Sequence, residues 1–397
     1  MRSLSKASIF IFFVQPFIGF VLACCNLKSK ANCLVFVLFY GLFGYAHSFA
    51  DKRSDSFRKL VDFISFPPST TFTDVLKEYI DGERLDVFEG FLFVFVKQFT
   101  NDAHVVLMLV GLMGGFFYML LIRRVLRFNH YMVLPVVLFI LIITVCSPVS
   151  IGGIRNFVAA SIFSFSTWMI LIEKRNLFFL LLCVCPFIHF GLILSVAAVV
   201  IVKFVPLPNS ALFWGAVIMC IASAFMDTSM FGDVMGRASQ LSGNQAVMSR
   251  SSVYSNEDTQ AEFDASLTTQ LTKVGGYFTR AFVLILLFYC RKRIKKNPNS
   301  GLDLQFYHYV LFFLFFGYSL SAFSVVGGRY LVVGFLLMHV FFNGLFYANW
   351  QDRYLRRMKL LLPACFAISI LWSLFNCYFV TRHNLYYQLL PIVIAGE

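Results

Sequence analysis

The sequence predicts an all-α integral membrane protein that crosses the bilayer many times. Of its 397 residues, 59% are hydrophobic and only 13% are charged, which is too apolar for a water-exposed surface. Long apolar blocks recur along the whole chain, and each can cross a hydrocarbon core of about 30 Å as a helix. We therefore expect one integral membrane domain over residues 1–397.

The apolar blocks give the order of the expected elements. We predict about eleven transmembrane helices, because one span needs roughly 20 mostly apolar residues. In chain order the blocks cover residues 8–26, 32–49, 104–122, 131–147, 153–172, 177–202, 211–226, 274–290, 305–325, 330–348 and 360–380.

Short basic connections set the orientation of these helices. Lys and Arg accumulate on the cytoplasmic side of membrane proteins, so we expect the basic clusters to face the cytoplasm. The clusters are Arg123, Arg124 and Arg127; Lys174 and Arg175; Arg291, Lys292, Arg293, Lys295 and Lys296; and Arg353, Arg356, Arg357 and Lys359. The net charge of +13 has the same origin, and no basic stripe with interleaved aromatic residues indicates binding to nucleic acid.

Whether all the basic clusters lie on one side of the membrane depends on how many times the block 177–202 crosses it. A single crossing there would put the later clusters opposite the earlier ones. Pro186 interrupts the block, His189 follows, and the block is longer than one span needs. We therefore predict a re-entrant pair of half-helices that returns to Lys203. The alternative is that another of the expected helices is false.

Two long polar connections then face away from the cytoplasm. The first, 50–103, contains an amphipathic run, Thr73–Tyr79, and a short apolar stretch, Val87–Phe99, which we expect to lie in the membrane interface. The second, 227–273, is rich in serine and contains three candidate substrate-binding residues, Arg237, Arg250 and Tyr254.

The sequence gives no sign of a cofactor or a metal. Its ten cysteines lie in or at the ends of apolar blocks, where they are expected to act as small packing residues. The sequence contains no phosphate-binding glycine loop, no His-Glu-x-x-His and no Gly-x-Ser-x-Gly. We therefore expect a protein that acts without a cofactor or a bound metal.

Three arginines begin apolar helices on the outer side, where positive residues are disfavoured. Arg155, Arg280 and Arg329 each lie shortly after a Gly-Gly pair. One hypothesis is that they bind an anionic, lipid-linked substrate, because guanidinium groups bind phosphate bidentately and glycines allow phosphate to approach backbone N–H groups. The alternative is that each arginine reaches the headgroups or pairs with an Asp or Glu of an outer connection.

Asp55 and His189 are the candidate acid–base residues. Asp55 and its neighbour Arg53 follow the second helix on the outer side, where a carboxylate could accept a proton from an attacking sugar hydroxyl. The alternative for Asp55 is a solvated loop charge or the N-cap of a short helix. His189 could bind substrate or transfer a proton, or it could satisfy backbone groups that Pro186 frees.

Short motifs occur in a fixed order along the chain. They are Arg53-Ser54-Asp55-Ser56-Phe57, Phe99-Thr100-Asn101-Asp102, Gly152-Gly153-Ile154-Arg155-Asn156, Ile188-His189-Phe190-Gly191 and Gly328-Arg329-Tyr330. Together, over about residues 45–350, they resemble the EpsG family, a Wzy-like group of exopolysaccharide and O-antigen polymerases.

The resemblance implies a glycosyltransferase-C-like architecture in the bacterial inner membrane. It implies that a glycan on undecaprenyl diphosphate is transferred at the outer face to a hydroxyl of another lipid-linked repeat unit. In that reaction Asp55 or His189 would deprotonate the acceptor. The implied partners are the lipid-linked oligosaccharide, membrane lipid, a chain-length regulator and a flippase. The residues that would bind the diphosphate and the glycan are Arg53, Arg155, Arg237, Arg250, Tyr254, Arg280 and Arg329.

Two other functions compete with polymerisation. A flippase or transporter would also use arginines for a diphosphate, but it should place charges along a central path that opens to both sides. A membrane O-acyltransferase that modifies the polysaccharide would need a catalytic histidine, and His189 is compatible with that role.

Overall fold

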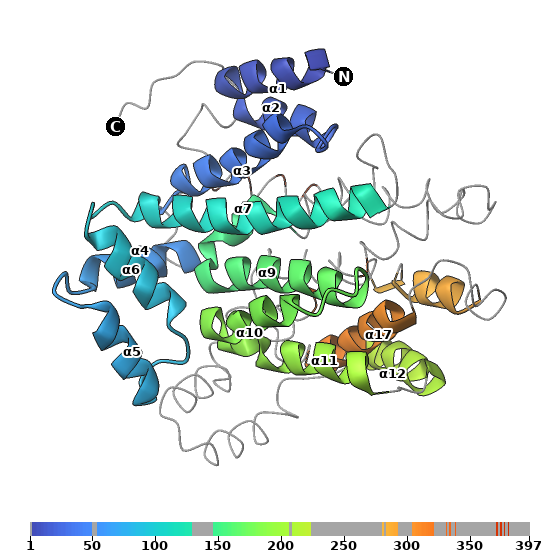
Figure 1. Cartoon of the computed structure of the whole chain (residues 1–397). Helices are drawn as coiled ribbons and strands as arrows, with labels where there is room; N and C mark the ends of the chain where they lie inside the picture. The colour runs from blue at the N-terminus through green and yellow to red at the C-terminus, as the bar shows by residue number, and fades with distance from the viewer. Residues whose placement is uncertain are drawn as a thin grey trace.

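The structure is a computed structural model in which every regular element among the described residues is a helix (Figure 1). No strand occurs among the described residues. These are residues 2–49, 54–128, 146–205, 209–223, 280–281, 283–292 and 304–320, with the single positions 331, 333, 334, 338, 371, 374, 377 and 380.

The described helices follow the predicted order of the apolar blocks, with three further helices in the first long connection. Residues 280–281 and 283–292 are also helical. The α-helices are α1 (Arg2–Val14), α2 (Pro16–Cys24), α3 (Lys30–Tyr45), α4 (Asp55–Ser65), α5 (Phe72–Ile80), α6 (Phe88–Lys97), α7 (Ala103–Phe128), α9 (Ile154–Leu171), α10 (Phe178–Ile188), α11 (Ile193–Phe204), α12 (Asn209–Ala222) and α17 (Leu304–Ser319). The 3-10 helices are η1 (Pro148–Gly152) and η2 (Phe190–Leu192).

Helix α9 is the centre of the bundle. From Phe157 to Leu171 every side chain is buried, which is typical of a helix surrounded by other helices. α7 and α10 pack along it. Aromatic contacts join it to α17, where Phe306 lies beside Trp168 with ring centroids 6.0 Å apart.

The backbones of α3 and α7 are in direct contact. A Cβ atom added at Gly44 would lie 2.2 Å from the carbonyl oxygen of Leu107, and one added at Gly111 would lie 2.2 Å from that of Tyr40. Any residue other than glycine at these two positions would clash with the backbone of the facing helix. Such contacts are common in membrane proteins, where helices associate through close packing.

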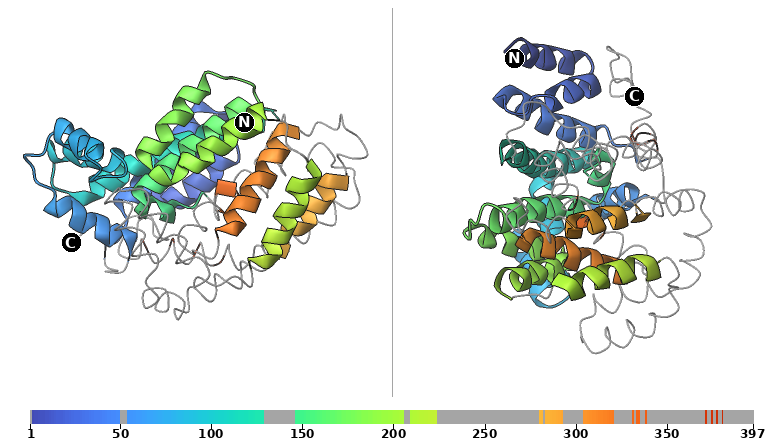
Figure 2. Two further views of the ribbon diagram at one scale, coloured as in Figure 1. Left: turned by 90° about the horizontal axis from the view of Figure 1, so that it is seen from below. Right: turned by 90° about the vertical axis from the view of Figure 1, so that its right-hand side faces the viewer.

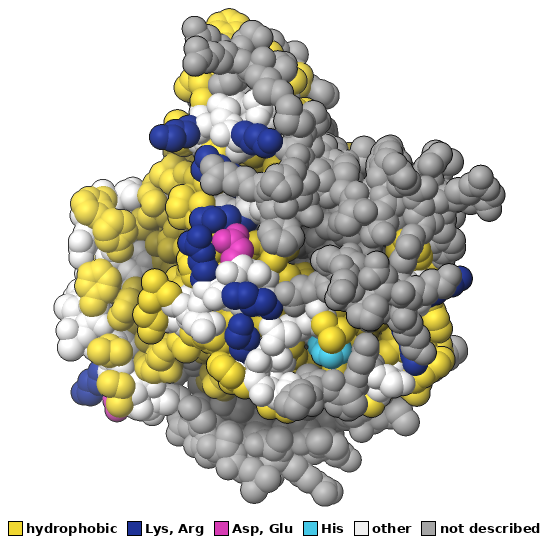
Figure 3. All heavy atoms as spheres, turned by 45° about the vertical axis from the view of Figure 1, so that its right-hand side comes forward, with side chains coloured by type: hydrophobic (Ala, Val, Ile, Leu, Met, Phe, Trp, Pro, Cys, Tyr) yellow, Lys and Arg dark blue, Asp and Glu magenta, His cyan; other side chains and the backbone are white. Residues whose placement is uncertain are grey.

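The long helices share two ends that differ in charge. α7 and α9 both begin beside the group of α4, α5 and α6 and end among basic residues, where Arg124 Nη1 lies 3.3 Å from Glu173 Oε2. Glu173 also pairs with Arg175 across 3.5 Å. Figure 3 turns this basic end toward the viewer and shows Lys and Arg side chains gathered between hydrophobic surfaces. Two of the predicted basic clusters therefore meet at one end of the bundle.

Arg291, the first residue of the third basic cluster, lies at the same end. Figure 2 shows α12, α17 and the helical segment 280–292 side by side. Lys174 Nζ donates to Gln305 Oε1 at the start of α17 across 2.8 Å. Arg291 donates to the hydroxyl of Ser210 at the start of α12 across 3.3 Å. α12 and α17 therefore begin at the basic end and finish at the opposite one.

The block that contains Pro186 forms a helical hairpin. α10 ends two residues after Pro186, which has no backbone N–H to donate, and His189 is extended. α11 then runs back, so that Phe204 near its end stacks on Phe179 near the start of α10. Lys203 donates to a backbone carbonyl at the end of α9 across 3.4 Å. The predicted break and the return to Lys203 are confirmed.

The prediction of one helix over 8–26 is wrong, because the structure has two helices there, α1 and α2. Pro16 disfavours helical backbone at the residue before it, and Gln15 accordingly adopts φ −147° and ψ 99°. The Gln15 side chain accepts a hydrogen bond from the N–H of Ile18 and so caps α2.

Several predictions fall mainly or wholly outside the described residues. They concern helices 131–147, 330–348 and 360–380 and the connection 227–273. In the connection 50–103, the amphipathic run is α5 and the apolar stretch is α6. The sequence did not predict α4 as an element, although it allowed a short helix at Asp55.

Two of the described helices are long and apolar enough to cross a membrane, α7 over Ala103–Leu126 and α9. Shorter apolar helices accompany them: Lys30–Tyr45, Phe178–Ile188, Phe190–Phe204 and Ser210–Ala222. The predicted count of about eleven spans is not confirmed.

Candidate functional site

The helices α4, α5 and α6 form a group beside the starts of α7 and α9 (Figure 1). Ser54 caps α4 by accepting a hydrogen bond from the N–H of Phe57. Thr71 and Asp74 form a capping box at the start of α5. The hydrogen bond from the Thr71 side chain, followed by that from its backbone N–H, lowers the pKa of Asp74 because both favour the ionised carboxylate. Local sequence signals therefore define helices in a connection that contains many polar residues.

The last turn of α10 forms a hydrogen bond with the start of α6. Phe187 lies in the last turn of α10, and its carbonyl accepts a hydrogen bond from the N–H of Val87 across 3.1 Å. The ring of Tyr79 contacts the Phe187 ring from the end of α5. Val87 is the N-cap of α6, so this contact fixes the carboxylates of Asp86 and Glu89 on either side of it.

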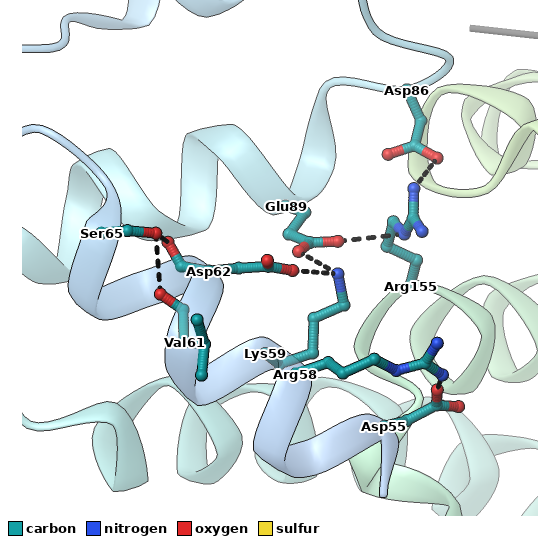
Figure 4. A network of polar contacts seen from close by, with 9 residues as sticks. All are labelled: Asp55, Arg58, Lys59, Val61, Asp62, Ser65, Asp86, Glu89 and Arg155. Carbon is teal, nitrogen blue, oxygen red and sulfur yellow. Dashed lines mark hydrogen bonds and ion pairs between the residues drawn. The ribbon is translucent and has the colours of Figure 1, made fainter. Parts of the chain in front are cut away.

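A chain of ion pairs joins α4, α6 and α9 (Figure 4). Arg155, the second residue of α9, donates from Nη1 to Asp86 Oδ2 across 2.9 Å and from Nε to Glu89 Oε2 across 3.0 Å. Lys59 of α4 lies 2.5 Å from the other oxygen of Glu89 and 2.9 Å from Asp62 Oδ2. The Asp86 side chain is only 3% exposed, so its contact with Arg155 lies in a buried position.

An open pocket of about 460 Å³ lies over this chain of ion pairs. α4 and α6 form its walls, and the start of α9 contributes Arg155. The lining residues are Lys59, Asp62, Ser65, Phe66, Pro67, Glu83, Arg84, Leu85, Asp86, Glu89, Phe93 and Arg155. A pocket that combines charged groups with aromatic rings is suited to a polar organic ligand.

A second junction, beside the pocket, brings together two of the sequence motifs. Ser56 Oγ lies 2.6 Å from His47 Nε2, and both side chains are buried. Burial, followed by the charge of His104, lowers the pKa of His47 to about 4, so the ring is neutral near pH 7. A Cβ atom at Gly152 would lie 2.4 Å from Ser56 Oγ. The Ser56 hydroxyl therefore occupies the space that the missing side chain of Gly152 leaves.

The structure gives the Gly-Gly pair before Arg155 a packing role. The Ser56 hydroxyl covers Gly152, and the N–H of Gly153 donates to the Ser150 carbonyl across 3.0 Å. Neither glycine is placed as the phosphate hypothesis requires. Arg155 itself pairs with two acidic residues of the connection 50–103, and pairing with such residues is the alternative that the sequence left open.

Asp55 is the first residue of α4 and does not line the pocket. Its carboxylate pairs with Arg58 one turn later, and both side chains are at least half exposed. Figure 4 shows this pair apart from the Lys59 and Arg155 contacts. The position near the start of a short helix matches the alternative for Asp55 more closely than the role of a general base.

His189 and Arg280 lie at other places at the same end of the bundle. His189 is the half-buried C-cap of α10, at the tip of the hairpin. Arg280 lies over the ring of Tyr318 near the end of α17, with its Cζ 5.8 Å from the ring centroid. Neither residue lines the pocket around Arg155. The remaining candidates, Arg53, Arg237, Arg250, Tyr254 and Arg329, lie outside the described residues.

Sequence analysis missed four residues of the ion-pair chain: Lys59, Asp62, Asp86 and Glu89. A weak signal existed, because Lys59 and Asp62 have the spacing of a helical ion pair and Asp86 and Glu89 flank the start of an apolar run. In the described part of the chain, no group of three or more His, Cys, Asp or Glu residues could hold a metal ion. Comparisons with protein-family models, with curated proteins and with solved structures found no match.

We expect Gly152→Ala to destabilise the protein by about 1–3 kcal/mol, because the new methyl group would overlap the Ser56 hydroxyl. In a Ser56→Ala background, Gly152→Ala should leave the free energy of unfolding almost unchanged, since the next contacts of the new methyl group lie at 3.4 Å and beyond. Thermal unfolding of the purified full-length chain and its three variants would measure this coupling. Equal costs in both backgrounds would contradict the packing role of Gly152.

We expect Arg155→Met to lower the free energy of unfolding by about 3–5 kcal/mol, because it removes a cation that contacts the buried Asp86 carboxylate. Adding Asp86→Asn should recover part of that loss by removing the charge. Arg155→Lys should be intermediate, since one ammonium group cannot reproduce the two directed contacts. Denaturant unfolding would rank the variants. An unchanged stability for Arg155→Met would show that the ion pairs contribute little.

Proposed function

We propose that this chain is a multi-pass protein of the bacterial inner membrane, with its basic end in the cytoplasm. Two helices of spanning length, the glycine contacts between α3 and α7 and the basic residues at one end support this proposal. Exposed apolar side chains on α10 and α12, such as Leu180 and Ile218, fit contact with lipid. The α10–α11 hairpin would enter and leave the membrane on the cytoplasmic side.

We further propose that the protein polymerises a lipid-linked glycan at the outer face. A glycan on undecaprenyl diphosphate would be transferred to a hydroxyl of a second lipid-linked unit, and undecaprenyl diphosphate would leave. The observation that carries this proposal is the open pocket of charged residues at the end of the bundle opposite the basic end. A pocket there would be reached from outside the cell and would lie close to the lipid that carries both substrates.

The geometry assigns Arg155 a positioning role within this proposal. Among the described residues, Arg155 contacts two carboxylates, those of Asp86 and Glu89, and joins the start of α9 to α6. We therefore assign the diphosphate to other arginines, of which Arg280 lies at the same end of the bundle. Guanidinium groups near the leaving diphosphate would stabilise the charge that develops on it.

For the proton acceptor, the geometry favours Asp62 over Asp55. Asp62 lines the pocket, its side chain is half exposed, and only Oδ2 is bound by Lys59. Oδ1 can face an acceptor hydroxyl. Asp55 lies outside the pocket and is paired with Arg58. A carboxylate within hydrogen-bond distance of the attacking hydroxyl is the geometry that general base catalysis requires.

The experiment for the proposed function is a gel ladder of the polysaccharide made by the natural host. Deleting the chain should reduce the ladder to single repeat units, and Asp62→Asn should shorten it by removing the general base, an effect of about 100-fold or more on rate. Asp81→Asn is the matched control, because Asp81 is an exposed carboxylate outside the pocket lining. Membrane levels of each variant would be measured in parallel.

The rival functions give different results in the same strain. If the deletion strain makes full ladders that lack only an acyl group, the protein is an acyltransferase. If single lipid-linked units accumulate on the cytoplasmic face, it is a flippase. A full, unmodified ladder without the chain would reject a role in this polysaccharide altogether.

The proposed topology predicts which side each end of the bundle faces. With a membrane-impermeant maleimide, Asp81→Cys should label in intact cells, whereas Arg175→Cys and Lys292→Cys should label only in opened membranes. Arg175 and Lys292 share a side only if α10 and α11 form a hairpin that returns. Labelling of Lys292→Cys in intact cells would contradict this topology, and the parent chain gives the background from its own cysteines.

A further inference from the structure

The pocket around Arg155 contains more acidic than basic residues. The basic residues of its lining are Lys59, Arg84 and Arg155. The acidic residues are Asp62, Glu83, Asp86 and Glu89. Each cation already has an acidic partner. Lys59 contacts Asp62 and Glu89, Arg155 contacts Asp86 and Glu89, and Arg84 contacts Glu78 at the end of α5.

Hydrogen-bond acceptors are therefore what the pocket offers to a ligand. Asp62 is half exposed and uses only one carboxylate oxygen, which binds Lys59. Glu83 is exposed, and its carboxylate has no partner among the described residues. Lys59 and Arg155 are 19% and 20% exposed and are held by their acidic partners. A ligand that donates hydrogen bonds can reach the free carboxylate oxygens of Asp62 and Glu83. An anionic ligand would meet cations that already pair with carboxylates, and it would lie beside four acidic side chains.

We propose that this pocket binds the acceptor sugar and selects it by charge, favouring an amino sugar over a neutral sugar and excluding an acidic one. The inference rests on the proposed function. An ammonium group would pair with Asp62 and Glu83, and hydroxyl groups would donate to the same oxygens. A uronic acid or a sulfated sugar would face these carboxylates, and repulsion of the wrong ligand is an effective source of specificity.

The net charge of the chain makes this preference diagnostic. At +13 the protein as a whole attracts anions, so binding driven by its long-range field would favour acidic sugars. A preference for amino sugars must therefore come from a local site. Because acidic residues outnumber basic residues in the pocket lining, we assign the donor diphosphate to a site outside this pocket.

The test measures binding of three soluble trisaccharides to the full-length chain in phosphatidylcholine nanodiscs. The probes are a glucosamine trimer, its neutral N-acetylated form and a galacturonic acid trimer, at a pH at which the amines and carboxylates are charged. We expect the amino trimer to bind about two- to fivefold more tightly than the neutral one, the size of an exposed ion pair. The acidic trimer should bind most weakly, and added salt should reduce the difference.

Substitutions at Glu83 locate the preference. Glu83→Gln should weaken binding of the amino trimer about two- to fivefold and leave the neutral trimer unchanged. Glu83→Lys should narrow or reverse the order of the amino and acidic trimers. Asp81→Asn, the same loss of one charge two residues away but outside the pocket, should change none of the three affinities. Unfolding temperatures would confirm that each variant is folded.

The outcomes separate this inference from the proposed function. If the acidic trimer binds as tightly as the amino trimer, or if the Glu83 variants keep the parent's order, selection by this pocket is wrong although the protein binds glycans. If none of the trimers binds, the glycan site itself is wrong and the proposed function loses its supporting observation.

Discussion

The positive charge of Arg155, at the start of a helix that is buried along its remaining length, is the constraint on which the site depends. An unpaired charge at such a place costs at least a few kcal/mol, so the neighbouring elements must supply acidic groups. α6 supplies them, because the last turn of α10 accepts the Val87 hydrogen bond and holds Asp86 and Glu89 in place. Lys59 then continues the chain of charges into α4 and opens the pocket between the two helices.

Sequence reasoning succeeded where one residue determines backbone geometry. Pro186 predicted the break in α10, and the distribution of basic residues predicted that the chain returns to the same end. The sequence singled out the Gly-Gly pair before Arg155, and in the structure the Ser56 hydroxyl lies in the space beside Gly152. A glycine in the sequence indicates close approach, and only the tertiary fold shows which group approaches.

The residues that sequence reasoning missed carry charges in a connection between apolar blocks. Asp62 and Glu89 look like solvated loop residues there, because nothing local shows that α4 and α6 pack against the start of α9. The prediction of one helix over 8–26 did not take Pro16 into account, and the chain breaks at the residue before it. Long-range contacts thus account for most of the differences at the site, and local signals explain most of the helices.

The α10–α11 hairpin returns the chain to the end of the bundle from which it started, because both of its ends lie beside the end of α9. Loss or gain of the whole pair would leave every later helix in its original orientation, whereas loss of a single helix would invert all of them. The presence of the hairpin therefore does not change the orientation of the helices that follow it. Its tip could change in length and sequence among related chains while the segments that follow keep their sidedness.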